Sequence, residues 1–582
     1  MNPLGKRCTL SLFLAAFAAA PLLAQAPPTN DANKRPQTAA SAIKVETRVV
    51  LLDVVVTDHK GETIPNLHEE DFQVAEDGKP QTISAFEEHR RETSAPVSLP
   101  ALPPNVYTNI QPVKSGDSVN VLLIDLLNTQ PWFQKGVCTQ AIKYLKTVPP
   151  GTRLAIFTLN TRQLRLVRGF TTDFSGLSVA LDDRKSGVTP ESSWLNPTPS
   201  RQAAELRGLD AMIMMQASPA AVGAVSDYLG QEAAFRMGNR SDLTLQAFQH
   251  LARYLSGIPA RKNVIWLADT FPISFLSEDK VHTPRHQERV QQTSDMLTAA
   301  QVAIYPVSAR GLVFDGEFDV PLDAPGEKML DEFATSQIAA ETIAQETGGR
   351  AFYNTNGLDA AMGKAIDEGS HYYTLAYSPT NARNDGKYCS IEVKLHDGDY
   401  KLSYRRGYYA DKPESPQTAE KGTEDPLIPL VGFGMPNFDQ ITYRVRAVPV
   451  QPQPAPNALR AGLNTEMKGP LVRYGADIAV SLQDFALETT PDGVRHGRIE
   501  AMLVAYDREG KIVNIAKRAS RFALKPEDYT RLQTKGLPLY LEIDIPPGDV
   551  YLRTGVYDWG SGNAGTLGFP LNTLPRTAAV PK

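Results

Sequence analysis

Two aspartates follow apolar runs that have the composition of buried strands. Asp125 lies in VNVLLIDLLNTQ (residues 119–130), and Asp269 lies in KNVIWLADTFP (residues 262–272). Apolar runs without polar alternation are typical of strands buried on both faces of a parallel sheet. Ligands of such sheets bind in the crevice beyond the carboxyl ends of the strands. Two carboxylates at two such ends could surround one hard cation, which indicates binding of another protein rather than bond-breaking chemistry.

The sequence motifs of common hydrolases are missing. There is no G-x-S-x-G and no H-E-x-x-H, and the nine histidines form no recognisable catalytic dyad. A dyad assembled only by folding would leave no such motif, so a secreted hydrolase stays as a minor alternative. We therefore expect a protein that is not an enzyme and has no catalytic residues.

Strand and helix patterns alternate from residue 118 to about residue 380. Such alternation predicts right-handed βαβ crossovers and a mostly parallel sheet, the doubly wound α/β class. The crossovers bring the carboxyl ends of neighbouring strands to one edge, where both aspartates would lie. Further strands are expected at residues 153–159 and 301–309, and helices at residues 134–147, 244–256 and 287–300.

The chain has 582 residues, too many for one core, so three or four domains are expected. Segments rich in Pro, Ser, Asn or charge indicate linkers between them. Alternating strands with Gly, Pro and Asp turns predict β structure on both sides of the α/β region. The predicted divisions are a linker (27–42), a small β-domain (43–90), a linker (91–117), the α/β domain (118–380) with insertions at 185–240 and 311–335, a β extension of it (381–411), a linker (412–439) and a β-sandwich (440–582).

The amino terminus has the pattern of a secretory signal peptide over residues 1–26. Lys6 and Arg7 precede an apolar run, and Ala24-Gln25-Ala26 is a small-x-small cleavage pattern. A retained membrane anchor is the alternative, because Pro27 directly follows the expected cut. Export to the periplasm, the cell surface or the medium is therefore expected, with membrane contact only through an uncleaved amino terminus.

The formal net charge of -5 and the pI near 6.1 give no reason to expect a nucleic acid as partner. Cys138 and Cys389 would remain after signal cleavage. They could pair in an oxidising compartment, but two cysteines do not make a disulfide scaffold in a chain of this size. Buried thiols are the favoured interpretation.

Several segments of the central region are similar to the von Willebrand factor type A (VWA) domain, a doubly wound α/β fold. The chain most resembles VWA-related proteins that are abundant in Acidobacteria, and its amino-terminal β-domain resembles the β-module that precedes the VWA domain there. The resemblance is specific for family and weak for function, since VWA folds have many partners. It rests on IDLLNT (124–129), SDLTLQAFQHLARYLSGIPARKNVIWLADTFPIS (241–274), AIYPVSARGL (303–312), ETGGRAFYNTNGLDAAMGKAIDEGSHYYTLAYSP (346–379) and LDVVVTDHKGETIPNLHEEDFQVAEDGKPQTISAF (52–86).

The resemblance implies a site for Mg²⁺, or for Mn²⁺ or Ca²⁺. VWA domains often hold such an ion through D-x-S-x-S, a later threonine and a last aspartate. In this chain Asp125 takes the first position, Leu127 and Thr129 the two serine positions, Thr244 the threonine position and Asp269 the last one. A hard divalent ion takes oxygen ligands and can keep a position open for a carboxylate of a partner.

Leu127 departs from the motif, because an aliphatic side chain cannot bind a metal ion. Asn128 could offer an amide oxygen, but strand alternation predicts that it points to the other side. Two interpretations therefore stay open. One is a degenerate metal site formed by Asp125, Thr129, Thr244 and Asp269. The other is a vestigial site in which Asp125 caps the following helix or accepts backbone N–H groups.

We expect from these features an exported, non-enzymatic binding or adhesion protein with a VWA-like domain. An envelope scaffold, in which that domain is a spacer and the β-domains make the contacts, is the alternative.

Overall fold

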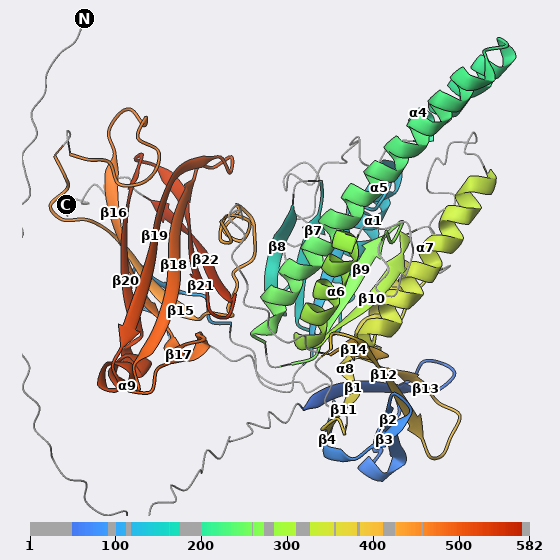
Figure 1. Ribbon diagram of the computed structural model, residues 1–582, viewed down its shortest axis with the longest axis horizontal. Helices are drawn as coiled ribbons and strands as arrows, with labels where there is room; N and C mark the ends of the chain where they lie inside the picture. The colour runs from blue at the N-terminus through green and yellow to red at the C-terminus, as the bar shows by residue number, and fades with distance from the viewer. Residues whose placement is uncertain are drawn as a thin grey trace, which may run out of the picture. The chain divides into compact units, whose positions relative to one another are not determined.

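The computed structural model describes residues 49–90, 101–111, 118–161, 163–174, 199–258, 260–272, 284–309, 326–353, 357–380, 385–410, 425–455 and 458–572. The expected signal peptide and the first linker lie outside these residues. The described chain is mixed α/β and contains several sheets, one of which has parallel strands (Figure 1). We name its parts the α/β domain, the β-module and the sandwich.

The sheet of the α/β domain has the strand order β10-β9-β6-β7-β8. The first four strands are parallel, and β8 joins the edge antiparallel to β7. Each residue of the parallel strands is buried, as the continuous apolar runs predict. The strands are β6 (Val119–Asp125), β7 (Leu154–Leu159), β8 (Leu164–Thr171), β9 (Lys262–Ala268) and β10 (Val302–Ser308).

Helices cover both faces of this sheet and bury a separate apolar core on each (Figure 1). Leu245 and Phe248 of α5 pack on the face that carries Leu123, with Leu297 of α6 and Ile343 of α7. The helices α1 and α8 pack on the face of Leu122 and Ile124. The helices are α1 (Pro131–Leu145), α5 (Pro219–Ser256), α6 (Pro284–Ala299), α7 (Gly326–Thr347) and α8 (Leu358–Ser370).

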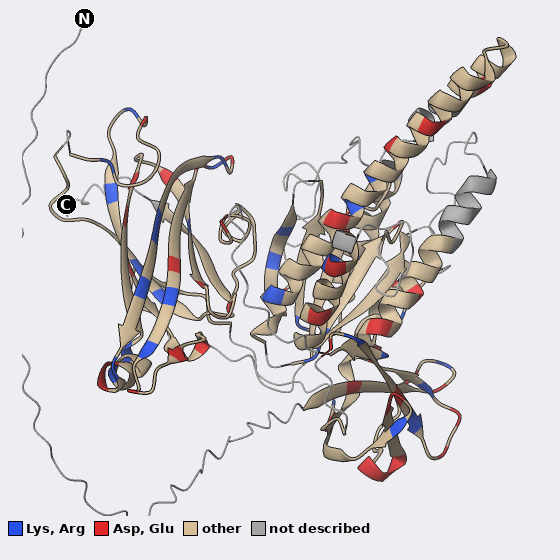
Figure 2. Ribbon diagram, viewed as in Figure 1, with Lys and Arg blue, Asp and Glu red and all other residues tan. Residues whose placement is uncertain are grey.

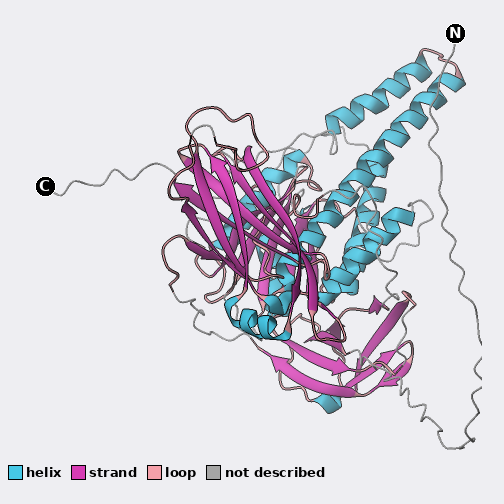
Figure 3. Cartoon of the chain, turned by 60° about the vertical axis from the view of Figure 1, so that its left-hand side comes forward, coloured by secondary structure: helices cyan, strands magenta, loops and turns pink. Residues whose placement is uncertain are grey.

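The insertion predicted at residues 185–240 contains a helical hairpin. Its first helix, α4 (Pro199–Met214), is followed by the amino-terminal half of the 38-residue α5. Ser218 caps α5 by accepting a hydrogen bond from the backbone N–H of Ala221, and Pro219 occupies its first turn. The hairpin extends well beyond the sheet (Figures 1 and 3). The described part of the insertion predicted at residues 311–335 is the beginning of α7.

The strand pairing of the β-module differs from the predicted domain boundaries. Strands β11 and β12, placed by prediction in or beside the α/β domain, pair with β1, β4 and β2. The strand orders are β13-β1-β11-β4 and β14-β12-β2-β3, and both sheets share one apolar core. The α/β domain is thus inserted into the β-module, and residues 372–410 are not its extension. The elements are β1 (Val50–Thr57), the 3-10 turn η1 (Glu69–Asp71), β2 (Phe72–Glu76), β3 (Lys79–Gln81), β4 (Ile83–His89), β11 (Tyr372–Tyr377), β12 (Tyr388–Leu395), β13 (Lys401–Ser403) and β14 (Gly407–Tyr409).

The carboxy-terminal sandwich consists of two antiparallel sheets around a common apolar core. One sheet has the order β20-β16-β15-β5, and the other has the order β17-β18-β21-β22 with β19 paired to β18. The elements are β5 (Val106–Thr108), β15 (Tyr443–Pro449), β16 (Val472–Val480), the 3-10 turn η3 (Leu482–Asp484), β17 (Glu488–Thr489), β18 (Arg495–Tyr506), β19 (Ile512–Leu524), α9 (Pro526–Lys535), β20 (Leu537–Ile545), β21 (Asp549–Asp558) and β22 (Ala564–Asn572).

Two predicted linkers are partly structured. β5 lies in the segment predicted as a linker at residues 91–117 and forms the edge of a sandwich sheet. In the segment predicted at residues 412–439, Leu427 and Phe438 are fully buried. Arg553 of β21 is also buried and donates hydrogen bonds to the carbonyls of Met435 (2.6 Å) and Pro436 (2.9 Å). Polar and proline-rich composition therefore did not distinguish a linker from a segment held by distant partners.

The split β-module leads to a prediction about fragments. A peptide of residues 43–90 should not fold alone, because β1, β2 and β4 would lack β11 and β12 and most of their shared core. Circular dichroism and amide chemical-shift dispersion check this. As a control, the same peptide joined through a Gly/Ser linker to residues 372–410 should fold. A dispersed spectrum of the isolated peptide would contradict the shared core.

Candidate functional site

The two strand-end aspartates lie at the same edge of the sheet, on neighbouring parallel strands. Ile124 of β6 pairs with Leu267 of β9, so the two strands end side by side. Asp125 is 0% exposed and Asp269 is 1% exposed. The backbone N–H of Asp269 donates to the carbonyl of Asn128 (3.2 Å). This edge is also where the strand order reverses direction around β6, the usual place of ligand crevices in α/β sheets.

The carboxylate of Asp125 accepts hydrogen bonds from Trp266 and Asn128 inside the protein. The indole Nε1–H of Trp266 donates to its Oδ2 (2.8 Å), and the backbone N–H of Asn128 donates to its Oδ1 (2.8 Å). The side-chain amide of Asn128 donates to Oδ2 as well (2.7 Å). Asp125 therefore accepts a backbone N–H group, as the vestigial interpretation expects. It does not cap the following helix, because Gln130 holds the N-cap position of α1.

The amide of Asn128 lies between two of the predicted metal ligands. Its Nδ2 donates both to Oδ2 of Asp125 (2.7 Å) and to Oγ1 of Thr244 on α5 (2.8 Å). The hydroxyl of Thr244 in turn donates to the carbonyl of Arg240 (2.7 Å). A neutral amide group thus makes the link that a cation would make between these two oxygens.

The expectation that Asn128 points away from the site is wrong. Strand alternation ends directly after Asp125, because the N–H groups of Leu126 and Leu127 both donate to the carbonyl of Leu159. This turn brings the side chain of Asn128 back over Asp125. Leu127 itself is 1% exposed and belongs to the apolar core on the α5 face.

Thr129 and Asp269, the other two predicted ligands, are buried at the same strand ends. The carbonyl of Thr129 accepts a hydrogen bond from Nε2 of Gln134 on α1 (3.0 Å). The structure therefore joins Asp125 to Thr244 through Asn128, and it joins Asp269 to the same turn through the backbone. Sequence reasoning missed the roles of Asn128 and Trp266. A signal for Asn128 was present, since Asp and Asn side chains often bind backbone groups of a turn.

Burial raises the pKa of the Asp125 carboxyl to about 6. Hydrogen bonds from Asn128, Trp266 and the backbone of Leu127 act in the opposite direction and stabilise the charged form. Fixed dipoles rather than a positive charge therefore offset part of the cost of burying the carboxylate.

These residues supply only part of the ligand set of a divalent metal ion. Such an ion needs about six oxygen ligands, whereas the polar hydrogens of the Asn128 amide already point at Asp125 and Thr244, and Leu127 supplies no oxygen. Among the residues that the structure describes, no group of three or more His, Cys, Asp or Glu side chains could hold a metal ion.

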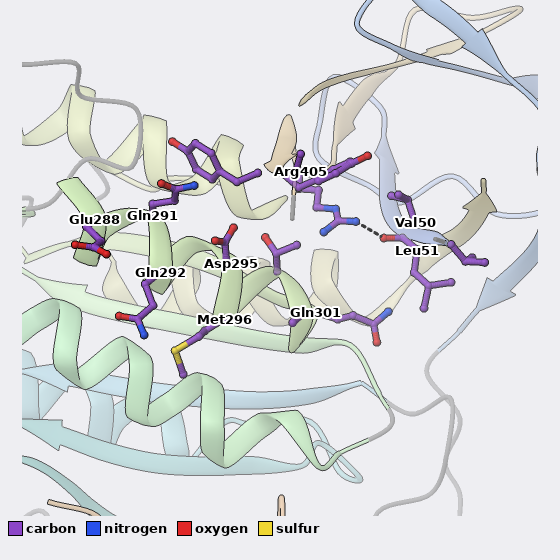
Figure 4. Close-up of a pocket in the computed structure, with 15 residues that line it drawn as sticks. Val50, Leu51, Glu288, Gln291, Gln292, Asp295, Met296, Gln301 and Arg405 are labelled. Carbon is purple, nitrogen blue, oxygen red and sulfur yellow. Dashed lines mark hydrogen bonds between the residues drawn. The ribbon is translucent and has the colours of Figure 1, made fainter. Parts of the chain in front are cut away.

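A separate cavity of about 670 Å³ lies between α6 and strands of the β-module (Figure 4). Glu288, Gln291 and Asp295 of α6 line one side, and Arg405 lies on the other. The guanidinium of Arg405 donates to the carbonyl of Leu51 (2.8 Å), the bond drawn in Figure 4, and lies 5.8 Å from the ring centre of Tyr408. Arg405 therefore makes contacts within the protein. The residues that line the cavity indicate no particular ligand.

A scan against models of known protein families finds no match, and a search of curated proteins finds no similar sequence. In the described part of the chain, no helix combines the length and apolar character needed to cross a membrane. Cys138 in α1 and Cys389 in β12 are not joined by a disulfide. The VWA family thus remains a prediction from the sequence.

Replacing Asn128 by Ala should destabilise the protein by about 2–4 kcal/mol, because Asp125 and Thr244 would lose a buried donor. Urea unfolding followed by tryptophan fluorescence measures the change. Asn239→Ala on the projecting part of α5 is the matched control, and it should change stability by no more than about 0.5 kcal/mol. Equal stability of the two variants would show that the hydrogen bonds from the Asn128 amide to Asp125 and Thr244 do not stabilise the fold.

The pKa of Asp125 gives a prediction about pH. The folded carboxyl titrates near 6, above the ordinary value of 3.8, so the folded state binds the proton more tightly. Wild-type stability therefore gains from Asp125 as the pH falls through this window, and Asp125→Ala lacks the gain. The destabilisation by Asp125→Ala should be about 2 kcal/mol larger at pH 4.5 than at pH 7.5. Urea unfolding at both pH values tests this, and a difference of opposite sign would contradict the buried charge.

Proposed function

We propose that this chain is an exported, non-enzymatic protein that binds another protein, and that its α/β domain belongs to the VWA kind but works without a metal ion. The observation that carries the proposal is the position of the Asn128 amide. It links Asp125 to Thr244 with two hydrogen bonds where a metal-dependent VWA domain would hold its ion. Recognition must then use surfaces other than a metal-bound carboxylate.

Two features support the VWA part of the proposal. The sheet is parallel around β6 with helices on both faces, and the motif positions Asp125, Thr244 and Asp269 lie at one edge of it. Export is supported by the basic and apolar pattern of residues 1–26 in the sequence.

The tip of the α4–α5 hairpin is the surface that best fits a protein partner. Residues 211–226 contain no Asp, Glu, Lys or Arg, and Figure 2 shows the charged residues of the hairpin outside this tip. Ile213, Met214 and Met215 are 59%, 85% and 84% exposed. Contiguous exposed apolar side chains mark interaction sites, and methionines adapt to the shape of a partner. Pro219 begins α5 25 residues before Thr244, which puts the tip roughly 38 Å along the helix from Thr244.

An envelope scaffold is the second candidate, because a filled crevice is equally compatible with a domain that serves as a spacer. In that case the β-module or the sandwich would make the contacts. Leu459 and Leu463 of the sandwich, 92% and 62% exposed, offer such a surface.

Cross-linked partners recovered from native envelope should be the same with and without EDTA. Met214→Ser/Met215→Ser should lose them, because the tip would lose its exposed apolar side chains. Leu459→Ser/Leu463→Ser is the matched control with a comparable loss of exposed apolar surface, and it should retain them. Loss of partners in the control alone would favour the scaffold, and loss in EDTA would overturn metal independence.

Titration calorimetry tests the metal part directly. Wild-type protein should release no heat with Mg²⁺, Mn²⁺ or Ca²⁺. Leu127→Ser/Asn128→Ala restores the serine position and removes the amide between Asp125 and Thr244, so this variant should gain Mg²⁺ binding. Circular dichroism of the variant controls for folding. Binding by the wild type that Asp125→Ala abolishes would contradict the proposal.

A further inference from the structure

A second cavity, of about 570 Å³, lies beside β8, the edge strand of the α/β sheet (Figure 1). Its lining comes from β8, from β5 and the residues after it, from the end of α5 and from the residue before β7. None of the described residues that line it is Asp or Glu, whereas two of them are arginines, Arg153 and Arg168. A cavity of this size suits a small molecule, and its charge favours an anion.

The strand β8 bulges where it lines this cavity. Its register on β7 shifts on either side of Ile156, which pairs with Arg168. Two residues of β8, Gly169 and Phe170, therefore face the single residue Ala155 of β7. Such bulges are common beside binding sites, where they change the direction of a side chain. Arg168 is exposed and forms no ion pair with any residue that the structure describes.

Tyr254 of α5 gives this cavity a buried hydroxyl. The side chain is 3% exposed, and its ring stacks on that of Phe170 with the ring centres 5.7 Å apart. The hydroxyl makes no hydrogen bond to the described part of the chain. Burial, followed by the charge of Asp439, raises the pKa of the Tyr254 phenol, so the hydroxyl stays protonated and can donate. A buried polar group without a partner is rare, and this donor is left for whatever fills the cavity.

The amide of Gln111 is a second donor without a partner. Its Nε2 is buried and has no hydrogen-bond partner among the described residues. The segment that carries it is anchored, because the amide of Asn109 donates to the carbonyls of Phe438 (2.7 Å) and Ile441 (2.8 Å). A donor that is already held in place loses little freedom when a ligand binds.

We propose that this cavity binds a small organic anion, a phosphate or carboxylate with an aromatic or apolar part. Arg153 and Arg168 supply the positive charge, and guanidinium groups match the geometry of both kinds of oxyanion. The Tyr254 hydroxyl and the Gln111 amide donate to the oxygens of the ligand. The ring of Phe170 faces its apolar part. An amine of the same size would meet two positive charges and no carboxylate of the described lining.

Ligand-observed NMR with phenyl phosphate as the probe tests the proposal on the full chain. The wild type should bind it with a Kd of roughly 1 mM or lower, and it should not bind benzylamine, which has the same ring and the opposite charge. Arg168→Glu should weaken phenyl phosphate binding by roughly tenfold or more. Arg521→Glu, the same charge change at an exposed arginine of β19, is the matched control and should bind as the wild type does. No binding by the wild type, or an equal loss in both variants, would overturn the proposal.

The hydroxyl of Tyr254 allows a test that separates binding from stability. Tyr254→Phe should keep the urea midpoint of the wild type, because the hydroxyl has no partner in the described chain, and should weaken phenyl phosphate binding by roughly threefold to tenfold. Tyr443→Phe should do the reverse, because the Tyr443 hydroxyl is hydrogen-bonded to that of Thr554 (2.6 Å). Unchanged affinity in Tyr254→Phe would overturn this placement of the ligand. Residues 213–215 do not line the cavity, so the result does not decide the proposed protein binding.

Discussion

The buried carboxylate of Asp125 connects three elements of the α/β domain. It lies at the end of β6, accepts a hydrogen bond from Trp266 of β9, and reaches Thr244 of α5 through the amide of Asn128. A carboxylate without access to water is costly unless hydrogen bonds compensate it. Hydrogen bonds from Asn128, Trp266 and the backbone of Leu127 offset part of this cost, and they link the strand ends to the helix. The rest of the edge depends on this network.

The network also bears on the proposal that this edge of the sheet works without a metal ion. A divalent cation and the Asn128 amide would compete for the same two oxygens, Oδ2 of Asp125 and Oγ1 of Thr244. The amide belongs to the chain and is always present, and the core position of Leu127 removes a further ligand. In the proposed function, the edge of the sheet is therefore a structural joint. The projecting α4–α5 hairpin offers the most exposed apolar side chains of the α/β domain as described.

The three parts of the molecule interlock along the chain. β5 precedes the α/β domain but pairs with β15 of the sandwich, and β11 follows the α/β domain but pairs with β1 and β4. Buried polar contacts strengthen the β-module, where Tyr377 and Tyr408 both donate to the carboxylate of Glu76 (2.7 and 2.9 Å). The buried Arg261, just before β9, also pairs with Asp53 of β1 (3.6 Å). Consecutive segments of this chain therefore do not correspond to independent folding units.

The sequence by itself determined the α/β class, the buried parallel strands and the meeting of Asp125 and Asp269 at one edge. These features depend on local periodicity and on the handedness of crossovers, which neighbouring residues encode. Only the tertiary structure decided that Asn128 turns back onto Asp125, that β11 and β12 complete the β-module, and that β5 belongs to the sandwich. Alternating side chains identify a strand but not its partner, because partners hundreds of residues apart are selected by the shape and burial of the whole core. The direction of the Asn128 side chain likewise depended on a turn, in which the N–H groups of Leu126 and Leu127 both donate to the carbonyl of Leu159 in β7.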